Sequence, residues 1–220
     1  MMTIRPSRPV RCAVRRRFAH APAVLVVAGL LLGGCAGQAS GPAVGWYGAH
    51  GGVAPAGERI YVCHAFGCAR KTAFDFTPRR LATMKRILAA GAASPEDERK
   101  AVARLISWSE KEIGPVAGSS GDIGGYDLHN AGVPGQMDCI DEATNTTSVL
   151  LVAARQGFLK HHKVTSPVAR GFFLDGRYPH ATAVLRETAS GKAWAIDSWP
   201  EANGKPPLVQ PLDAWFASRS

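Results

Sequence analysis

The sequence predicts an α+β fold, in which helices come first along the chain and antiparallel strands follow. Three helical segments with recognisable N-terminal signals occupy residues 77 to 157, and from residue 167 the chain changes to short apolar runs separated by turns. Segregated helices and strands, rather than alternating ones, are typical of this fold class. We therefore expect N-terminal helices packed on an antiparallel sheet.

The first two helices are predicted by matching start signals. A short strand, RIYVC at 59–63, precedes them. The first helix begins with Thr77 as N-cap and Pro78 at the first helical position, and the second begins in the same way with Ser94 and Pro95. Apolar residues then recur at helical spacing in both, so we expect these helices to pack and to carry no chemistry.

A third helix is expected to begin after Asp138. Asp138 can act as N-cap, and Asp141 and Glu142 fall in the first turn, where acids are stabilised by the positive end of the helix. The preceding stretch, residues 114–137, is rich in glycine and has no periodicity. Loops of this length in compact domains are often functional, so we expect this one to line a cleft.

Three strands are expected in the last part of the chain. They are PVARGFFLDG from residue 167, HATAVLRE from 180 and AWAIDSW from 193. The turn-prone segment TASGK separates the last two, which favours a hairpin.

The first 34 residues have the features of an export signal. They contain six arginines and no acid, followed by the apolar run AVLVVAGLLL, which is too short to span a bilayer. The junction LGGC resembles the lipobox of bacterial lipoproteins, whose cysteine is acylated and becomes the mature N-terminus. This resemblance makes Cys35 the lipidation site. Ala36 after it favours a lipid-anchored location on the periplasmic face of the outer membrane.

The chain is expected to consist of a signal peptide (1–34), a flexible Gly/Ala/Pro tether (35–57) and one folded domain (58–220). The whole chain has 26 basic and 17 acidic residues, and without the six signal arginines 20 minus 17 leaves a net charge of +3. This net charge is small, and the sequence has no basic patch with interleaved aromatic residues. It therefore gives no reason to propose a nucleic-acid partner.

Three cysteines remain once the signal and Cys35 are set aside. In an oxidising compartment, Cys63 and Cys68 are expected to form a disulfide that closes a small loop. A zinc site at Cys63, His64 and Cys68 would lack a fourth ligand at the usual spacing, and the spacing is not that of a thioredoxin-type motif. Cys139 is the thiol left over.

The position of Cys139 predicts a nucleophile. Unpaired N–H groups in the first turn of a helix lower a thiol pKa and can bind a developing oxyanion. His180 is the candidate base, and Asp197, an acid within an apolar strand, is the candidate to orient it. A two-residue turn at Ser190 and Gly191 would leave His180 and Asp197 four residues, roughly 13 Å, apart on one face. The pairing therefore requires a longer turn or a bulge.

The motifs MDCIDEA, HATAVL and AWAID, in this order, resemble those of the bacterial transglutaminase-like cysteine peptidases over about residues 100 to 200. The family pattern around the nucleophile resembles Gly-Asp-Cys-Glu-Asp. Here Asp138, Cys139 and Asp141 keep their places, while Met137 and Ile140 depart from the pattern.

The resemblance implies a papain-like core and a catalytic triad of Cys139, His180 and Asp197 that works through a thioester acyl-enzyme. Gln136 becomes the candidate for a second oxyanion donor. Some relatives bind calcium through acids beside the cysteine, and Ile140 departs from that pattern here. We therefore expect no cofactor, with calcium as the one alternative that the resemblance leaves open. The predicted function is a cell-envelope thiol hydrolase, a peptidase or amidase acting on protein or peptide substrates.

Two other functions fit the same residues. Cell-wall peptidases of the NlpC/P60 type have a similar Asp-Cys helix start, although their third residue is usually His where this chain has Asp197. A non-catalytic lipoprotein that retains the fold as a scaffold would leave Cys139 as a buried structural thiol.

Overall fold

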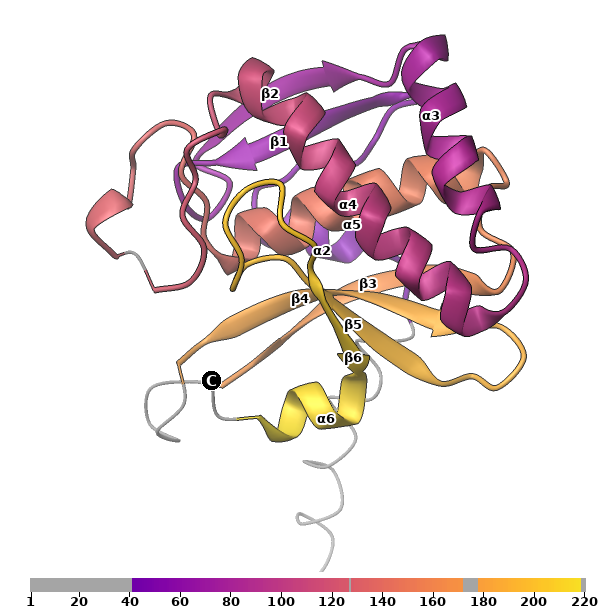
Figure 1. Ribbon diagram of the computed structural model, residues 1–220. Helices are drawn as coiled ribbons and strands as arrows, with labels where there is room; N and C mark the ends of the chain where they lie inside the picture. Colours follow the sequence, from indigo (N-terminus) through magenta and orange to yellow (C-terminus); the bar gives the residue numbers. More distant parts are fainter. Residues whose placement is uncertain (1–40, 127, 172–177, 219–220) are drawn as a thin grey trace, which may run out of the picture. The chain divides into compact units, whose positions relative to one another are not determined.

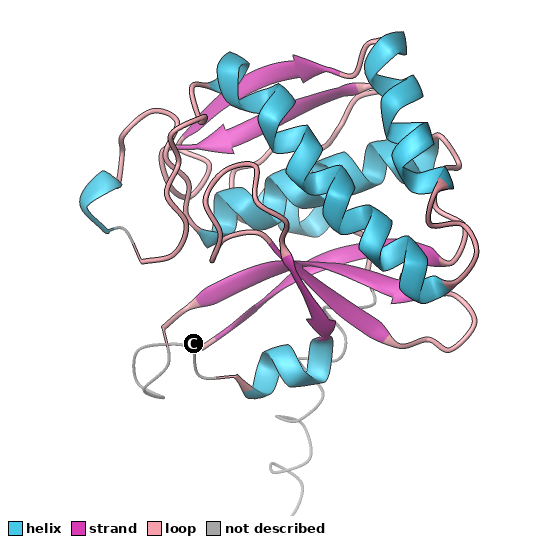
Figure 2. Ribbon diagram, viewed as in Figure 1, coloured by secondary structure: helices cyan, strands magenta, loops and turns pink. Residues whose placement is uncertain are grey.

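The computed structural model describes residues 41–126, 128–171 and 178–218, and it has the predicted α+β architecture (Figures 1 and 2). The helices and strands, in chain order, are α2 (Val44–Ala49), β1 (Arg59–His64), β2 (Arg70–Asp75), α3 (Pro78–Ala89), α4 (Pro95–Ala117), the 3-10 turn η1 (Leu128–Asn130), α5 (Cys139–Arg155), β3 (His162–Arg170), β4 (His180–Glu187), β5 (Ala193–Asp197), β6 (Leu208–Pro211) and α6 (Leu212–Ala217). Within these residues, no helix is long and apolar enough to cross a membrane.

The strands form two separate antiparallel sheets, and α5 packs against both. β1 pairs with β2, while the larger sheet has the order β3-β4-β5-β6. α4 and α5 cover one face of the larger sheet and α6 covers the other (Figure 1). Because α5 contacts β1 on one side and β4 on the other, it is buried along most of its length. The main core lies around it.

The residues that the sequence predicted as helix N-caps have this role in the structure. The Thr77 hydroxyl accepts a hydrogen bond from the Arg80 N–H at the start of α3, and the Ser94 hydroxyl accepts one from the Asp97 N–H at the start of α4. Asp138 caps α5 in a reciprocal capping box with Asp141. Caps of this kind satisfy N–H groups that have no partner within the helix.

The predicted flexible tether is folded in the part that the structure describes, which is a correction. Residues 35–40 lie outside the described residues, but α2 packs on the domain with Trp46 and Tyr47 buried. The Trp46 indole N–H donates to the Thr144 hydroxyl at 2.9 Å, and the Tyr47 hydroxyl lies 2.9 Å from that of Ser148. Both partners are on α5, so this segment is part of the domain.

The β4–β5 hairpin has the longer turn that the candidate triad requires. The strands pair Ala183 with Ile196 and Arg186 with Ala193, and the Glu187 N–H donates to the Lys192 carbonyl at 2.8 Å. The loop is therefore 188–191 instead of the two residues considered above. This register brings Asp197 two residues closer to His180 along the sheet.

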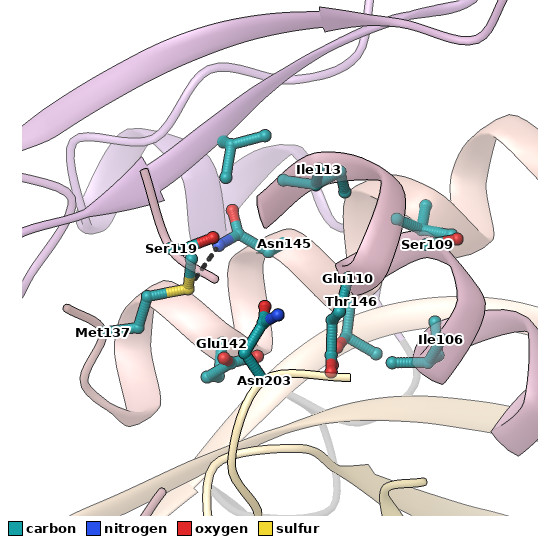
Figure 3. A pocket seen from close by; sticks show the side chains of 12 residues that line it. Ile106, Ser109, Glu110, Ile113, Ser119, Met137, Glu142, Asn145, Thr146 and Asn203 are labelled. Atoms are coloured by element: carbon teal, nitrogen blue, oxygen red, sulfur yellow. Dashed lines mark hydrogen bonds between the residues drawn. The ribbon is translucent and has the colours of Figure 1, made fainter. Parts of the chain in front are cut away.

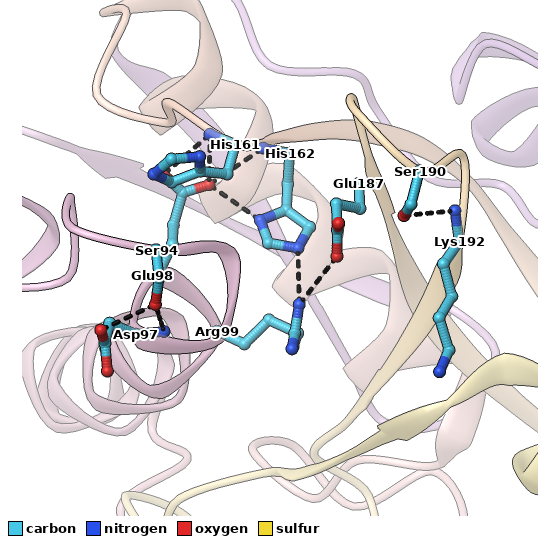
Figure 4. A network of polar contacts seen from close by, with 9 residues as sticks. All are labelled: Ser94, Asp97, Glu98, Arg99, His161, His162, Glu187, Ser190 and Lys192. Atoms are coloured by element: carbon cyan, nitrogen blue, oxygen red, sulfur yellow. Dashed lines mark hydrogen bonds and ion pairs between the residues drawn. The ribbon is translucent and has the colours of Figure 1, made fainter.

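A buried carboxylate joins α4 to the start of β3 (Figure 4). Glu98, 1% exposed, accepts hydrogen bonds from the N–H groups of Lys160, His161 and His162 and from the His162 ring at 2.9 Å. Burial raises the pKa of Glu98, but these hydrogen bonds outweigh it, so the pKa lies below its ordinary value. His161 and His162 therefore hold the start of β3 against α4.

We expect Glu98→Gln to destabilise the protein by about 1.5–3 kcal/mol, because three N–H groups lose a charged acceptor. The contribution of Glu98 is present above its unfolded pKa near 4.5 and is lost as the pH falls through the lower folded pKa. Urea unfolding between pH 3 and 7 should therefore show that the unfolding free energy of the variant falls less on acidification than that of the wild type. Glu96→Gln, an exposed change on the same helix, is the control, and equal effects of the two changes would contradict this role.

Candidate active site

Cys139 is the first residue of α5 and is 8% exposed. Its sulfur lies 3.9 Å from the carbonyl oxygen of Pro179, and the N–H of Ala181 also interacts with it. Pro179 and Ala181 flank His180 in the chain, so the start of α5 lies against the start of β4. Cys139 is the only free cysteine in the described part of the chain.

The predicted disulfide between Cys63 and Cys68 is confirmed, and it closes an unusual turn. Ala65, Phe66 and Cys68 have φ values of 68°, 67° and 55°, and Gly67 between them has 61°. Four successive residues are thus left-handed, and each non-glycine residue costs about 1–2 kcal/mol in this conformation.

Two acids at the start of α5 stabilise this turn. Asp141, 0% exposed, accepts the N–H of Phe66 at 2.8 Å and that of Cys68 at 2.6 Å, while Asp138 accepts that of Gly67 at 3.0 Å. Hydrogen bonds to a carboxylate contribute roughly 1.5–3 kcal/mol each, enough to offset the backbone cost. The acids that cap the helix therefore also fix the disulfide loop over it.

His180 and Asp197 form the predicted pair. The His180 Nε2 atom lies 2.6 Å from Asp197 Oδ2, and the two residues are each 3% exposed. Within the residues that the structure describes, the other ring nitrogen, Nδ1, has no hydrogen-bond partner. An imidazole held in this way by one nitrogen keeps the other available to exchange a proton.

Two tryptophans that the sequence analysis did not assign to the site enclose this pair. The His180 ring centroid lies 4.6 Å from that of Trp199 and 5.4 Å from that of Trp215. The Trp215 indole N–H also donates to Asp197 Oδ2 at 2.8 Å. Trp215 comes from α6, on the far side of the sheet from α5, and no spacing rule links it to the other residues. Its role depends on the fold.

Cys139 and His180 line the same cavity, which has a volume of about 310 Å³. Tyr178 and Trp199 are among its lining residues, and their rings stack with centroids 5.9 Å apart. Outside the lining, the Tyr126 ring packs edge-on against both. Gly125, from the glycine-rich loop that was expected to line a cleft, also borders the cavity. A mostly apolar cavity with few polar groups is typical of a ligand site.

The thiol of Cys139 is not activated by the helix start, contrary to the expectation from sequence. Burial and the negative charge of Asp138 raise its pKa from 9.0 to about 12, and the N–H groups of Ala181 and Cys139 only partly oppose this. Asp197 raises it further. A thiol of this kind needs a base that removes its proton during the reaction.

Gln136, the candidate second oxyanion donor, lies outside this site. Its Nε2 atom donates to the carbonyl of Gly121 at 3.1 Å, its Oε1 atom accepts from Asn130 at 3.3 Å, and it is not among the residues that line the cavity. The N–H of Cys139 remains as the donor next to the sulfur.

The acids beside the cysteine do not fit a calcium site. Both oxygens of Asp141 accept main-chain N–H groups, the side chain of Ile140 has no ligand atom, and its carbonyl oxygen accepts the Thr144 hydroxyl. The one group of three metal-ligand side chains found in the described residues joins Asp141 to Cys63 and Cys68, which are bonded to each other.

Comparisons with protein-family models, with curated proteins and with solved structures found no match to this chain.

We expect Trp215→Phe to destabilise the protein by about 1–2 kcal/mol, because the buried Asp197 loses one of its two donors while the aromatic packing is largely kept. Alkylation of Cys139 should also become several-fold slower, since Asp197 then holds His180 less firmly. Chemical unfolding and the alkylation rate measure the two effects. Trp108→Phe, at the edge of the main core, is the control, and equal behaviour of both variants would refute the assigned role.

Proposed function

We propose that this protein is a thiol hydrolase, a peptidase or amidase, with Cys139 as nucleophile, His180 as general base and acid, and Asp197 as the residue that orients His180. One observation carries this proposal: His180 is bound to Asp197 through Nε2, has Nδ1 without a partner among the described residues, and shares a cavity with Cys139. A cysteine, an imidazole and a carboxylate in this order are the parts of a nucleophilic triad.

In the acylation step, His180 Nδ1 takes the proton from the Cys139 sulfur as the sulfur attacks the carbonyl carbon of the substrate. The carbonyl oxygen becomes negatively charged and is stabilised by the N–H of Cys139. His180 then donates the proton to the leaving nitrogen, the C–N bond breaks, and a thioester on Cys139 remains.

In the deacylation step, His180 removes a proton from water, which attacks the thioester carbonyl. The C–S bond breaks, the acid product leaves, and the proton returns to the sulfur, so no net charge accumulates over the cycle. Asp197 stabilises the imidazolium in both steps and keeps the ring in one orientation.

The raised pKa of the thiol makes proton transfer part of the attack. A thiol with a pKa near 12 is almost entirely protonated at neutral pH. The protein would therefore hold a neutral thiol until a carbonyl is bound, and the base is essential in this scheme.

The resemblance to transglutaminase-like cysteine peptidases supports the same function, and with it a papain-like core. The lipobox at Cys35 supports a lipid-anchored protein at the periplasmic face of the outer membrane, where the substrate would be a protein or peptide of the cell envelope. The NlpC/P60 alternative is disfavoured because Asp197, and not a histidine, binds His180. A scaffold that keeps the fold is distinguished by the experiments below.

We expect His180→Ala to slow alkylation of Cys139 by iodoacetamide at least tenfold at neutral pH, because general-base assistance contributes on the order of 10²–10⁴-fold. Mass spectrometry of the peptide that contains Cys139 gives the rate for this residue alone. His129→Ala, an exposed histidine, should react like the wild type. Equal rates in wild type and His180→Ala would remove His180 from the mechanism.

We expect new protein N-termini to appear in envelope fractions incubated with the wild type and to be absent with Cys139→Ala. The substitution removes the nucleophile and leaves a small apolar side chain at a buried position. N-terminal proteomics of the two samples would identify the substrate. Identical sets, with Cys139→Ala folded, would favour the scaffold function over catalysis.

A further inference from the structure

The cavity at Cys139 is lined in part by the disulfide turn. Phe66, in the middle of that turn, lines the cavity together with Cys139 and has φ 67°, a left-handed conformation that is rare for a bulky residue. Its N–H donates to Asp141, two residues after Cys139, at 2.8 Å. The turn that carries the ring is therefore bound to the helix start that carries the sulfur. Residues held in costly backbone conformations cluster at functional sites.

Other large apolar side chains complete the lining from different parts of the chain. Tyr178 and Trp199 contribute a pair of nearly parallel rings, with an interplanar angle of 4°, and Ile140 follows Cys139 in α5. Aromatic rings favour offset or edge-on contact with another ring. An apolar side chain that enters the cavity therefore finds ring surfaces to pack against.

The charged side chains at this cavity already bond within the protein. Asp138 and Arg170 are the charged residues that line it in addition to the proposed triad. One oxygen of Asp138 caps α5, and the other accepts the Gly67 N–H at 3.0 Å. Arg170 donates to the Ser218 carbonyl, and its guanidinium lies over the Trp215 ring, 4.5 Å from the centroid. The lining therefore favours an apolar occupant over a charged one.

The size of the cavity fits an amino-acid side chain. Its volume of about 310 Å³ is within the range of small-molecule sites. The small cavity on the other side of the start of α5, which Met137, Glu142 and Asn145 help to line (Figure 3), has a volume of about 20 Å³ and room for about one water molecule. Of the two, only the cavity at Cys139 has space for part of a substrate.

We propose that the residue whose carbonyl Cys139 attacks has a large apolar side chain, such as that of phenylalanine, which enters this cavity and packs against Phe66 and Trp199. This side chain branches from the carbon next to the attacked carbonyl, so it lies close to the Cys139 sulfur during the attack. Phe66 is then a specificity-determining residue. The inference rests on the proposed function and adds its substrate class.

The test compares N-acetylated chloromethyl ketones of phenylalanine, alanine and aspartate on the full-length chain in detergent. In each reaction the Cys139 sulfur forms a C–S bond and chloride leaves. Mass spectrometry of the peptide that contains Cys139 gives the rates, each divided by the rate of the same label with free cysteine. The phenylalanine label should react at least about tenfold faster than the alanine label, because its ring becomes buried. Equal rates, or a faster aspartate label, would overturn the proposal.

Phe66→Gly removes the ring and keeps the turn, because glycine adopts a left-handed φ without strain. The ratio of the phenylalanine-label rate to the iodoacetamide rate should fall by roughly threefold to tenfold, since part of the apolar lining is lost. Ala65→Gly is the matched control, because Ala65 has φ 68° in the same turn and is not among the lining residues. It should keep the wild-type ratio. An unchanged ratio in Phe66→Gly would overturn the role of Phe66.

Division by the iodoacetamide rate separates this inference from the proposed function. A change in the reactivity of the Cys139 thiol alters both rates and cancels in the ratio, whereas the lining affects the label that carries a ring. New N-termini in the envelope fractions without a preference for the phenylalanine label would keep the hydrolase and overturn this inference. The preference without new N-termini would support the apolar cavity and count against the hydrolase.

Discussion

The buried start of α5 is the constraint on which the rest of the structure depends. The helix packs against both sheets, so its first turn is enclosed and its N–H groups need partners within the protein. Asp138 and Asp141 satisfy the helix start and, with their remaining oxygens, hold the left-handed disulfide turn above it. Cys139, the first residue of the helix, is thereby fixed against β4.

The same burial decides the electrostatics at the start of α5. An enclosed helix start has lost the water that would stabilise a thiolate or a carboxylate, so the pKa of Cys139 rises to about 12 and those of Asp141 and Glu142 rise as well. Acids that stabilise the helix also oppose a negative sulfur. For this reason reactivity in the proposed mechanism depends on His180.

Local signals in the sequence predicted most helix starts correctly, because a cap and a proline at the first helical position act within a few residues. Composition gave a wrong prediction where contacts with residues distant in the sequence decide whether a segment is folded. The segment around Trp46 has the glycine and alanine content of a flexible tether, yet its indole and the Tyr47 hydroxyl find partners on α5, 98 and 101 residues away. A short aromatic pair of this kind gives no periodic signal.

The sequence by itself determined the α+β fold class, the disulfide between Cys63 and Cys68, and the placement of Cys139 at a helix start and of His180 at a strand start. The tertiary structure alone decided the β4–β5 register that joins His180 to Asp197 and the hydrogen bond from the Trp215 indole to that carboxylate. It also decided the bonding of Gln136 to Gly121 and Asn130 and the direction in which the pKa of Cys139 shifts. The division has one physical reason. Helix capping and side-chain periodicity depend on residues that are close together in the sequence. The desolvation of a side chain and the register of a strand depend on which other elements pack against it.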